Sequence, residues 1–220
     1  MDKVFDPVLR VIIVDDDALT RTGVSSLIGS LGYEIVGVAK SVTEAILLTK
    51  KKAIDVAVID LDLGDGPNGL DLANALLKTS PKMGIVFLTS HLDPRFALAA
   101  DSELPENSVY LIKNQVNDRG VLARALSEAI ENADVSRSRL NLPFRKKTGI
   151  ATFTSAQVTL MKLIASGLTN NEIATQKGVS VKSVETFISR LAKQVGVKSG
   201  DGLNQRVLIV KEFQKYSGKI

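Results

Sequence analysis

Three carboxylates early in the chain are spaced so that they could share one cation. Asp15 and Asp16 follow directly on an apolar run at 11–14, and Asp60 follows another at 56–59. If these runs are neighbouring parallel strands, their carboxyl ends bring the three side chains to one edge of a sheet. Clustered anions repel one another unless a cation joins them, and oxygen ligands alone favour Mg²⁺. The acid pair could instead cap a following helix, but that alternative leaves Asp60 unexplained.

Two further polar side chains stand where other strands of the same sheet would end. Thr89 follows an apolar run at 85–88, and Lys113 follows one at 109–112. A hydroxyl and an ammonium at these positions could contact a phosphoryl group carried by Asp60. Thr and Lys are each common in loops. Together with the acid pair and Asp60, all at strand ends, they form a set that favours phosphoryl transfer.

The elements that must position these residues follow from the hydrophobic periodicity. Five apolar runs, the remaining one at 35–38, are short, rich in β-branched residues and nearly continuous. Such runs are typical of strands buried on both faces of a parallel sheet. Helical patterns alternate with them, at 19–31, 42–51, 70–78 and 122–130. The alternation predicts a doubly wound α/β domain with a five-stranded parallel sheet.

Length and charge divide the chain into two parts. Its 220 residues exceed the usual single domain of about 100 to 150 residues. Residues 1–131 contain 13 Lys/Arg and 19 Asp/Glu, a net charge of −6, whereas residues 132–220 contain 15 and 5, a net charge of +10. A basic C-terminal part attracts phosphate backbones, although lysine and arginine that merely solvate a surface would give the same count.

Composition also excludes several classes of protein. The chain has no cysteine, which rules out disulfides and cysteine-ligated metal centres. Its first ten residues carry charges and a proline where a signal peptide needs an apolar run, and no stretch stays apolar for the roughly 18 residues of a membrane span. We therefore expect a cytoplasmic protein without a membrane segment.

The second part reads as a basic linker followed by helices. Residues 132–150 lose all periodicity and are rich in Arg, Lys and Ser, which indicates an exposed linker. Capping boxes at Thr154 and Thr169 predict helices near 155–166 and 170–177. A turn at Gly178, a third helix capped by Ser180 and a fourth near 203–215 complete the pattern. In the fourth helix Leu203, Val207 and Val210 fall on one apolar stripe. The sequence thus predicts an all-α domain over 151–220.

The third of these helices has a mixed polar face of the size that enters a DNA groove. It would bury Val184, Ile188 and Leu191 and turn short polar and basic side chains outward. Arg and Lys on such a face suit phosphates, and the short polar groups suit base edges in a major groove. The outward residues are Lys182, Glu185, Thr186, Ser189, Arg190 and Lys193. A solvated amphipathic helix and a protein-binding surface are the alternatives.

The motifs of the first part resemble a known family. Residues 10–131 resemble the receiver domains of two-component response regulators, through VDDD at 14–17, IDLDLGDGPNG at 59–69, FLTS at 87–90 and YLIK at 110–113. The resemblance implies that Asp60 accepts a phosphoryl group from a sensor histidine kinase. It also implies that Mg²⁺ is held by Asp15, Asp16, Asp60 and the backbone carbonyl of Asp62. By the same match Thr89 and Lys113 bind the phosphoryl oxygens, and Tyr110 swings inward when Thr89 is drawn toward them.

The helical part resembles the helix-turn-helix domain of NarL/LuxR-type regulators. LIASGLTNNEIA at 163–174 and VSVKSVETFISRL at 179–191 carry this resemblance. It implies binding to double-stranded DNA as a homodimer, with the fourth helix as the dimerisation helix, although that helix could equally complete the domain core. Phe187 departs from the family, where histidine is frequent, so a phosphate contact from that side chain is lost.

Asn114 and His91 stand near the strand ends of the first part. Asn114 follows Lys113 where the family usually has proline, often with a cis peptide, and a cis bond without proline would cost about 2.5 to 4 kcal/mol. The geometry of that loop is therefore an open question. His91, the only histidine, stands two residues after Thr89 and is expected to be a solvated loop residue.

The sequence as a whole predicts a response-regulator transcription factor and not an enzyme. Phosphorylation of Asp60 would control dimerisation and sequence-specific DNA binding. The principal alternative is an atypical regulator that binds DNA independently of phosphorylation. Asp60-Leu61-Asp62 also resembles the nucleophile motif of haloacid-dehalogenase-type phosphatases, but those enzymes carry that motif on their first strand with the acidic metal ligands downstream. Here the acid pair lies upstream, which disfavours a phosphatase.

Overall fold

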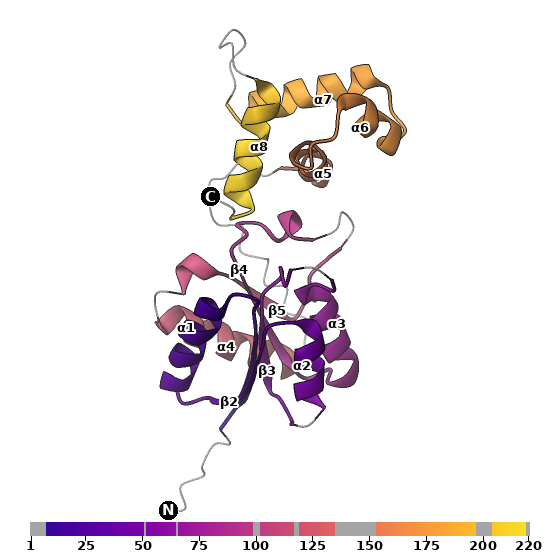
Figure 1. Ribbon diagram of the computed structural model, residues 1–220. Helices are drawn as coiled ribbons and strands as arrows, with labels where there is room; N and C mark the ends of the chain where they lie inside the picture. Colours follow the sequence, from indigo (N-terminus) through magenta and orange to yellow (C-terminus); the bar gives the residue numbers. More distant parts are fainter. Residues whose placement is uncertain are drawn as a thin grey trace, which may run out of the picture. The chain divides into compact units, whose positions relative to one another are not determined.

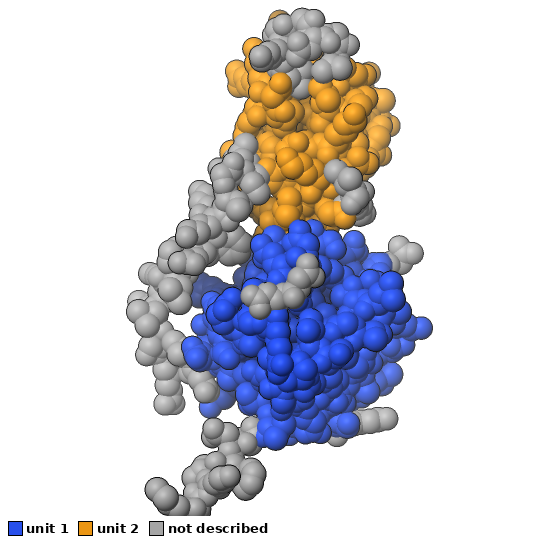
Figure 2. Space-filling view, turned by 90° about the vertical axis from the view of Figure 1, so that its left-hand side faces the viewer, with its two compact units in different colours: residues 1–90, 103–141 blue, residues 91–102, 142–220 orange. Residues whose placement is uncertain are grey.

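The computed structural model describes residues 8–50, 52–64, 66–98, 102–116, 119–134, 153–196 and 204–218. These residues form two compact units, which are considered separately. Unit 1 comprises residues 1–90 and 103–141, and unit 2 comprises residues 91–102 and 142–220 (Figure 2). Among the described helices, none has the length and apolar character needed to cross a membrane.

Unit 1 is built on one parallel sheet of five strands, as the apolar runs predict. The strand order is β2-β1-β3-β4-β5, and every neighbouring pair is parallel. All residues of β3 and β4 are buried, which explains why their sequences show no alternation. The strand bounds are Arg10–Val14 for β1, Glu34–Ala39 for β2, Val56–Ile59 for β3, Gly84–Thr89 for β4 and Ser108–Ile112 for β5.

Four α-helices cover the two faces of this sheet, which confirms the doubly wound fold (Figure 1). Helices α1 and α4 lie on one face, and α2 and α3 lie on the other. Two short 3₁₀ helices, η1 and η2, follow β4 and β5. The helix bounds are Ala18–Ser30 for α1, Val42–Thr49 for α2, Gly69–Thr79 for α3, Arg119–Asp134 for α4, Pro94–Phe96 for η1 and Lys113–Gln115 for η2.

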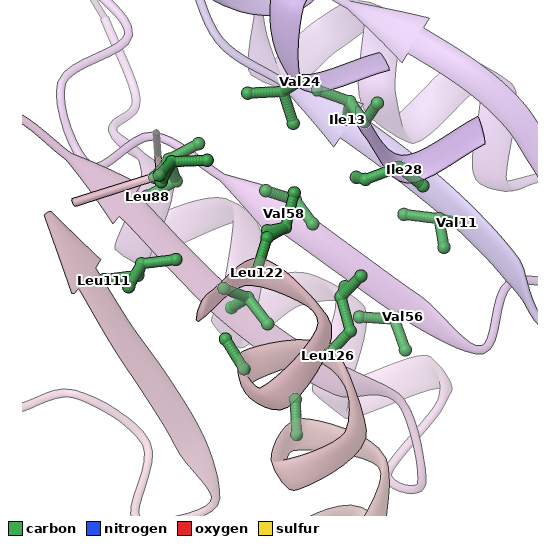
Figure 3. Packing of buried hydrophobic residues seen from close by; sticks show 14 residues of the cluster. Val11, Ile13, Val24, Ile28, Val56, Val58, Leu88, Leu111, Leu122 and Leu126 are labelled. Atoms are coloured by element: carbon green, nitrogen blue, oxygen red, sulfur yellow. The ribbon is translucent and has the colours of Figure 1, made fainter. Parts of the chain in front are cut away.

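The main core of unit 1 lies between the sheet and the α1/α4 layer. Figure 3 shows aliphatic side chains of four strands facing Val24 and Ile28 of α1 and Leu122 and Leu126 of α4. Burying such side chains stabilises the fold by roughly 1.5 to 3 kcal/mol each relative to exposure. This packing fixes the sheet, and so fixes where the strand ends lie.

Unit 2 contains the predicted helices, opened by the predicted caps. They are α5 (Ser155–Ala165), α6 (Asn170–Lys177), α7 (Val181–Gln194) and α8 (Gln205–Tyr216). Capping boxes close at Thr154 and Thr169, and the Ser180 side chain caps α7. Gly178 adopts φ 63°, the left-handed conformation that the turn between α6 and α7 requires.

Two parts of the predicted organisation differ in detail or fall outside the described residues. In α8 the buried positions are Ile209 and Tyr216, while Val207, predicted on the apolar stripe, is 50% exposed. Leu203 lies outside the described residues. Helix α4 continues to Asp134, and the rest of the predicted linker at 135–150 also lies outside them.

Candidate functional site

The predicted acidic cluster forms at the carboxyl edge of the sheet. Strands β1 and β3 are neighbours, with Val14 opposite Ile59, so the residues that follow them are side by side. One carboxylate oxygen from each of Asp15, Asp16 and Asp60 lies within 4.8 Å of the other two. Asp15 and Asp60 are buried, whereas Asp16 is exposed. The sheet therefore holds two charged groups out of water beside a third that solvent can reach.

Lys113, which follows the edge strand β5, lies in the same site. Its Nζ lies 2.6 Å from Asp60 Oδ2 and 2.8 Å from Asp15 Oδ2. The lysine follows β5 directly and opens η2, so the strand end places it. One ammonium thus neutralises part of the charge of two buried carboxylates, a pairing that such burial requires.

Burial and pairing act in opposite directions on these groups. Burial raises the pKa of Asp60 to about 6, although the hydrogen bond and the charge of Lys113 oppose that rise. Burial likewise raises the pKa of Asp15. For Lys113, burial lowers the pKa, but the hydrogen bonds and charges of the two carboxylates outweigh it and leave the pKa raised. At neutral pH, above the pKa of Asp60, the site therefore carries a charged lysine beside the ionised Asp60 carboxylate.

The cluster fits a hard divalent cation. Asp15 Oδ2 is buried, and apart from its contact with Lys113 it has no partner among the described residues. A buried carboxylate oxygen with spare coordination capacity, beside two further carboxylates, is suited to Mg²⁺. The side chain of Asp62 is exposed, while its N–H donates to Asp60 Oδ1 at 3.2 Å. The acidic cluster is compatible with Mg²⁺ binding through Asp15, Asp16 and Asp60.

A glycine that the sequence reasoning missed shapes the same site. Gly69 opens α3 directly after the Asn68 cap, and a Cβ at position 69 would lie 1.9 Å from the backbone oxygen of Asp60. The start of α3 therefore packs on the peptide of the phosphoacceptor candidate itself. The available signal was a glycine directly before the helix predicted at 70–78.

Thr89 and Tyr110 lie on β4 and β5, as predicted. Thr89 is fully buried at the end of β4 and pairs in register with Ile112, the residue before Lys113. Tyr110 is partly buried and pairs with Phe87. The hydroxyl of Thr89 and the ammonium of Lys113 thus come from adjacent strand ends, the arrangement expected for two groups that contact one phosphoryl.

The structure shows the geometry at Asn114 and the burial of His91. The described chain contains no cis peptide bond, so Asn114 sits in η2 with an ordinary trans linkage. The prediction that His91 is a solvated loop residue was wrong, because only 5% of it is exposed. His91 starts a segment that packs with unit 2.

In unit 2, helix α7 presents the predicted face. Val184, Ile188 and Leu191 are buried. Of the six residues predicted to point outward, all are exposed except Ser189, which is partly buried. Ser189 Oγ lies 3.5 Å from Oε1 of Gln205, the first residue of α8. The Phe187 side chain is 47% exposed beside this face.

Both units match families of known proteins. Residues 11–105 match the model of the response regulator receiver domain, and residues 151–205 match that of bacterial regulatory proteins, luxR family. The chain is 30% identical over 203 residues to the DNA-binding transcriptional activator DevR/DosR of Mycobacterium tuberculosis, covering 86% of this chain and 89% of that protein. It is also 30% identical to the nitrate/nitrite response regulator protein NarP of Escherichia coli, over 86% and 90% of the two chains.

A solved structure supports the same fold across the chain. RcsB from Salmonella enterica serovar Typhimurium, bound to promoter rprA in the presence of phosphomimetic BeF3⁻, aligns with a TM-score of 0.56 at 19% identity. The alignment covers 94% of this chain and 98% of that one.

Proposed function

This chain belongs to the response regulators of the NarL/LuxR type, and we propose that phosphorylation of Asp60 controls its binding to double-stranded DNA. It is a DNA-binding transcriptional regulator and not an enzyme. Receiver domain, linker and DNA-binding domain are assigned to residues 1–131, 132–150 and 151–220. We place the protein in the cytoplasm, where a sensor histidine kinase would act on it.

One observation carries the proposal: a buried carboxylate at a central strand end is paired with Lys113 and joined to two further acids. Asp60 follows β3, the middle strand of the five, whereas Asp15, which is also buried and paired with Lys113, follows β1. An isolated buried ion pair would be a weak argument, because burying charge costs free energy that pairing only partly returns. Three acids around one lysine at a sheet edge are the arrangement expected of a site that binds a cation and a phosphoryl group.

The residues present account for phosphoryl transfer from a histidine of the kinase. An oxygen of Asp60 attacks the phosphorus as the bond from phosphorus to the histidine nitrogen breaks, and an acyl phosphate forms. Lys113 then moves its ion pair to the new phosphoryl oxygens, and Thr89 donates a hydrogen bond to them. Asp15, Asp16, Asp60 and the backbone carbonyl of Asp62 would hold Mg²⁺, which neutralises charge during the transfer. Tyr110, on the neighbouring strand, would follow Thr89 inward.

We assign DNA binding to helix α7. We propose that its exposed face enters a major groove and that two chains bind as a symmetric homodimer on two half-sites. The residues proposed to contact DNA are Lys182, Glu185, Thr186, Ser189, Arg190 and Lys193. Ser189 is partly buried, and its hydroxyl lies 3.5 Å from Oε1 of Gln205.

Phosphorylation of the full chain is expected to tighten DNA binding about 5- to 150-fold, the usual range of coupling between two sites. The chain is incubated with Mg²⁺ and acetyl phosphate, and its intact mass, its size in solution and its affinity for duplexes selected from a random pool are measured. A mass gain of one phosphoryl group with unchanged affinity and size would favour the alternative, a regulator that binds DNA independently of phosphorylation.

Substitutions on α7 should distinguish residues that recognise bases from residues that contact phosphates. Glu185 carries a negative charge on the proposed DNA-binding face, and the phosphate backbone repels that charge. Its presence there is understandable chiefly if it accepts a hydrogen bond from a cytosine amino group or orients a neighbouring arginine. Glu185→Ala is therefore expected to relax base preference at one position per half-site, by about 1 to 3 kcal/mol of discrimination.

Arg190→Ala is the matched comparison for Glu185→Ala. It should weaken all sequences alike and reduce the slope of affinity against salt by roughly one unit. Selection from random duplexes checks both variants. An unchanged preferred sequence for Glu185→Ala would place base reading at Thr186 and Ser189 instead.

A further inference from the structure

The loop that carries the acid pair, residues 15–17, is bound on both of its flanks. The Asp15 N–H donates to the Ala39 carbonyl of β2 at 3.1 Å. The Asp17 N–H donates to Asp15 Oδ1 at 2.9 Å, and the Asp17 side chain accepts from two amides of the first turn of α1. The Asp15 carbonyl needs a partner as well, because this residue is only 2% exposed and a buried backbone carbonyl requires a donor.

Arg21 of α1 supplies that donor. Its Nη1 donates to the Asp15 carbonyl oxygen at 2.6 Å, so the bond runs from inside the helix back to the loop before it. The Arg21 side chain is partly buried. A hydrogen bond from an ionised donor is shorter than one between neutral groups and roughly twice as strong. Because a guanidinium stays protonated throughout the ordinary pH range, this donor is always present.

Arg21 does not serve here as the partner of an acid. Within the described part of the chain, its guanidinium forms no ion pair with a carboxylate. The cation that pairs with the buried acids is Lys113. Since Lys113 already supplies the neutralising charge, what Arg21 contributes to this site is its bond to the backbone.

The peptide that Arg21 holds is the one between Asp15 and Asp16. A peptide unit is planar, so a fixed carbonyl fixes the whole plane and the directions in which the chain leaves it on both sides. Those directions decide where the side chains of the two acids begin. One oxygen from each of Asp15, Asp16 and Asp60 lies within 4.8 Å of the others, and Mg²⁺ demands near-ideal octahedral geometry. Rotation of this one peptide would therefore displace two of the proposed ligands at once.

We propose that Arg21 is a positioning residue of the cation site, which holds the Asp15–Asp16 peptide so that both carboxylates face the ion. This inference rests on the proposed function, because phosphorylation of Asp60 requires Mg²⁺ at this cluster. Arg21 acts on the cation only through the two acids.

The sign of the effect distinguishes positioning from electrostatic repulsion. A guanidinium is itself a cation, and two cations near one site repel each other. If the charge of Arg21 dominated, its removal would tighten Mg²⁺ binding. If its bond to the peptide dominates, its removal weakens binding, since loss of a group that orients metal ligands costs about 10- to 100-fold in affinity. We expect the second result.

Arg21→Met tests this expectation, because it removes the guanidinium but keeps an unbranched stem that covers the same apolar surface. Mg²⁺ alone, without a phosphodonor, is titrated into the full chain, and binding is followed by the NMR chemical shifts of the amides of Asp15, Asp16 and Asp60. The dissociation constant is expected to rise about 10- to 100-fold in the variant.

Two further variants separate the bond from the charge. Arg21→Lys keeps a charge and a donor, so its affinity for Mg²⁺ should fall between those of Arg21→Met and the unsubstituted chain. Arg124→Met is the matched control, because it removes the same charge from an exposed position on α4. It should bind Mg²⁺ as the unsubstituted chain does.

The spectra recorded without Mg²⁺ show whether each variant is folded, and a second measurement needs no substitution. In the Mg²⁺-bound unsubstituted chain the Nη protons of Arg21 should stay in slow exchange with water, because the bond persists. An Asp60 amide that does not respond to Mg²⁺ in the unsubstituted chain would contradict the proposed function. If that chain binds Mg²⁺, the role of Arg21 alone would be overturned by equal or tighter binding in folded Arg21→Met, by an equal loss in Arg124→Met, or by fast exchange of the Nη protons.

Discussion

Asp60→Asn is expected to abolish Mg²⁺-dependent phosphorylation completely. The amide that replaces the carboxylate is a poor nucleophile and a weak ligand for a divalent cation, so attack on phosphorus and charge neutralisation fail together. Incubation with acetyl phosphate and Mg²⁺, followed by intact mass, should show the full mass gain for the unsubstituted chain and none for the variant.

The loss should not come from unfolding. The pKa of Asp60 lies at about 6 because of burial, above its ordinary value of 3.8. A carboxyl whose folded pKa is raised binds more protons in the folded state, so its contribution to stability falls as pH rises from about 4 to about 6. Above pH 6 the ionised Asp60 side chain destabilises the metal-free fold, and substitution by the neutral Asn removes this destabilisation. Lys113 keeps Asp15 as its partner at 2.8 Å.

Asp62→Asn is the matched control for this substitution. The two residues are separated by one position, but the Asp62 side chain is exposed and lies outside the acidic cluster. Its proposed part in metal binding uses the backbone carbonyl, which Asn retains. Labelling should therefore survive in Asp62→Asn. Undiminished labelling of Asp60→Asn, or loss of labelling in both variants, would contradict the assignment of Asp60.

The strand ends of unit 1 were predictable because a strand buried on both faces is an uninterrupted apolar run in the sequence. Strand β3 is four consecutive apolar residues followed by Asp60, and β4 is six buried residues ending in Thr89. Once the sheet is parallel, the position of each end residue follows from topology alone. The helices of unit 2 were predictable for a local reason, since capping boxes at Thr154 and Thr169 are set by residues three apart.

The segment after β4 was not predictable in the same way. Phe96 is buried by Phe153, Phe213 and Tyr216, which are distant in the sequence, so no periodicity within 91–98 announces its burial. In α8, similarly, exposure of Val207 depends on which neighbours pack around the helix, and a stripe of apolar residues does not determine that choice.

Gly69 shows why a close backbone approach also escapes sequence reasoning. The φ angle of Gly69 is not positive, so nothing about its conformation requires glycine. What requires it is the peptide of Asp60, which lies nine positions earlier in the chain and would stand 1.9 Å from a Cβ. Only the folded loop between β3 and α3 brings the two together.

Gly69→Ala is accordingly expected to lower the free energy of unfolding by about 3 kcal/mol, at the upper end of overpacking effects. Its Cβ would meet the carbonyl oxygen of Asp60 at 1.9 Å and the carbonyl carbon at 2.8 Å, and backbone atoms cannot turn aside as a flexible side chain can. Either α3 or the end of β3 must move. Because β3 carries Asp60, the surviving folded protein should also be phosphorylated more slowly. Urea denaturation and timed intact-mass measurements check the two effects.

Gly23→Ala separates this steric clash from the general effect of adding a methyl group. Gly23 is exposed within α1, and a Cβ there would have nothing within 4 Å. Alanine in a helix interior is favoured over glycine by roughly 0.5 to 1 kcal/mol, so this variant should be slightly more stable than the unsubstituted chain. Opposite signs for one and the same substitution would locate the cause in the Asp60 peptide. A Gly69→Ala protein as stable and as readily phosphorylated as Gly23→Ala would mean that α3 does not pack against that peptide.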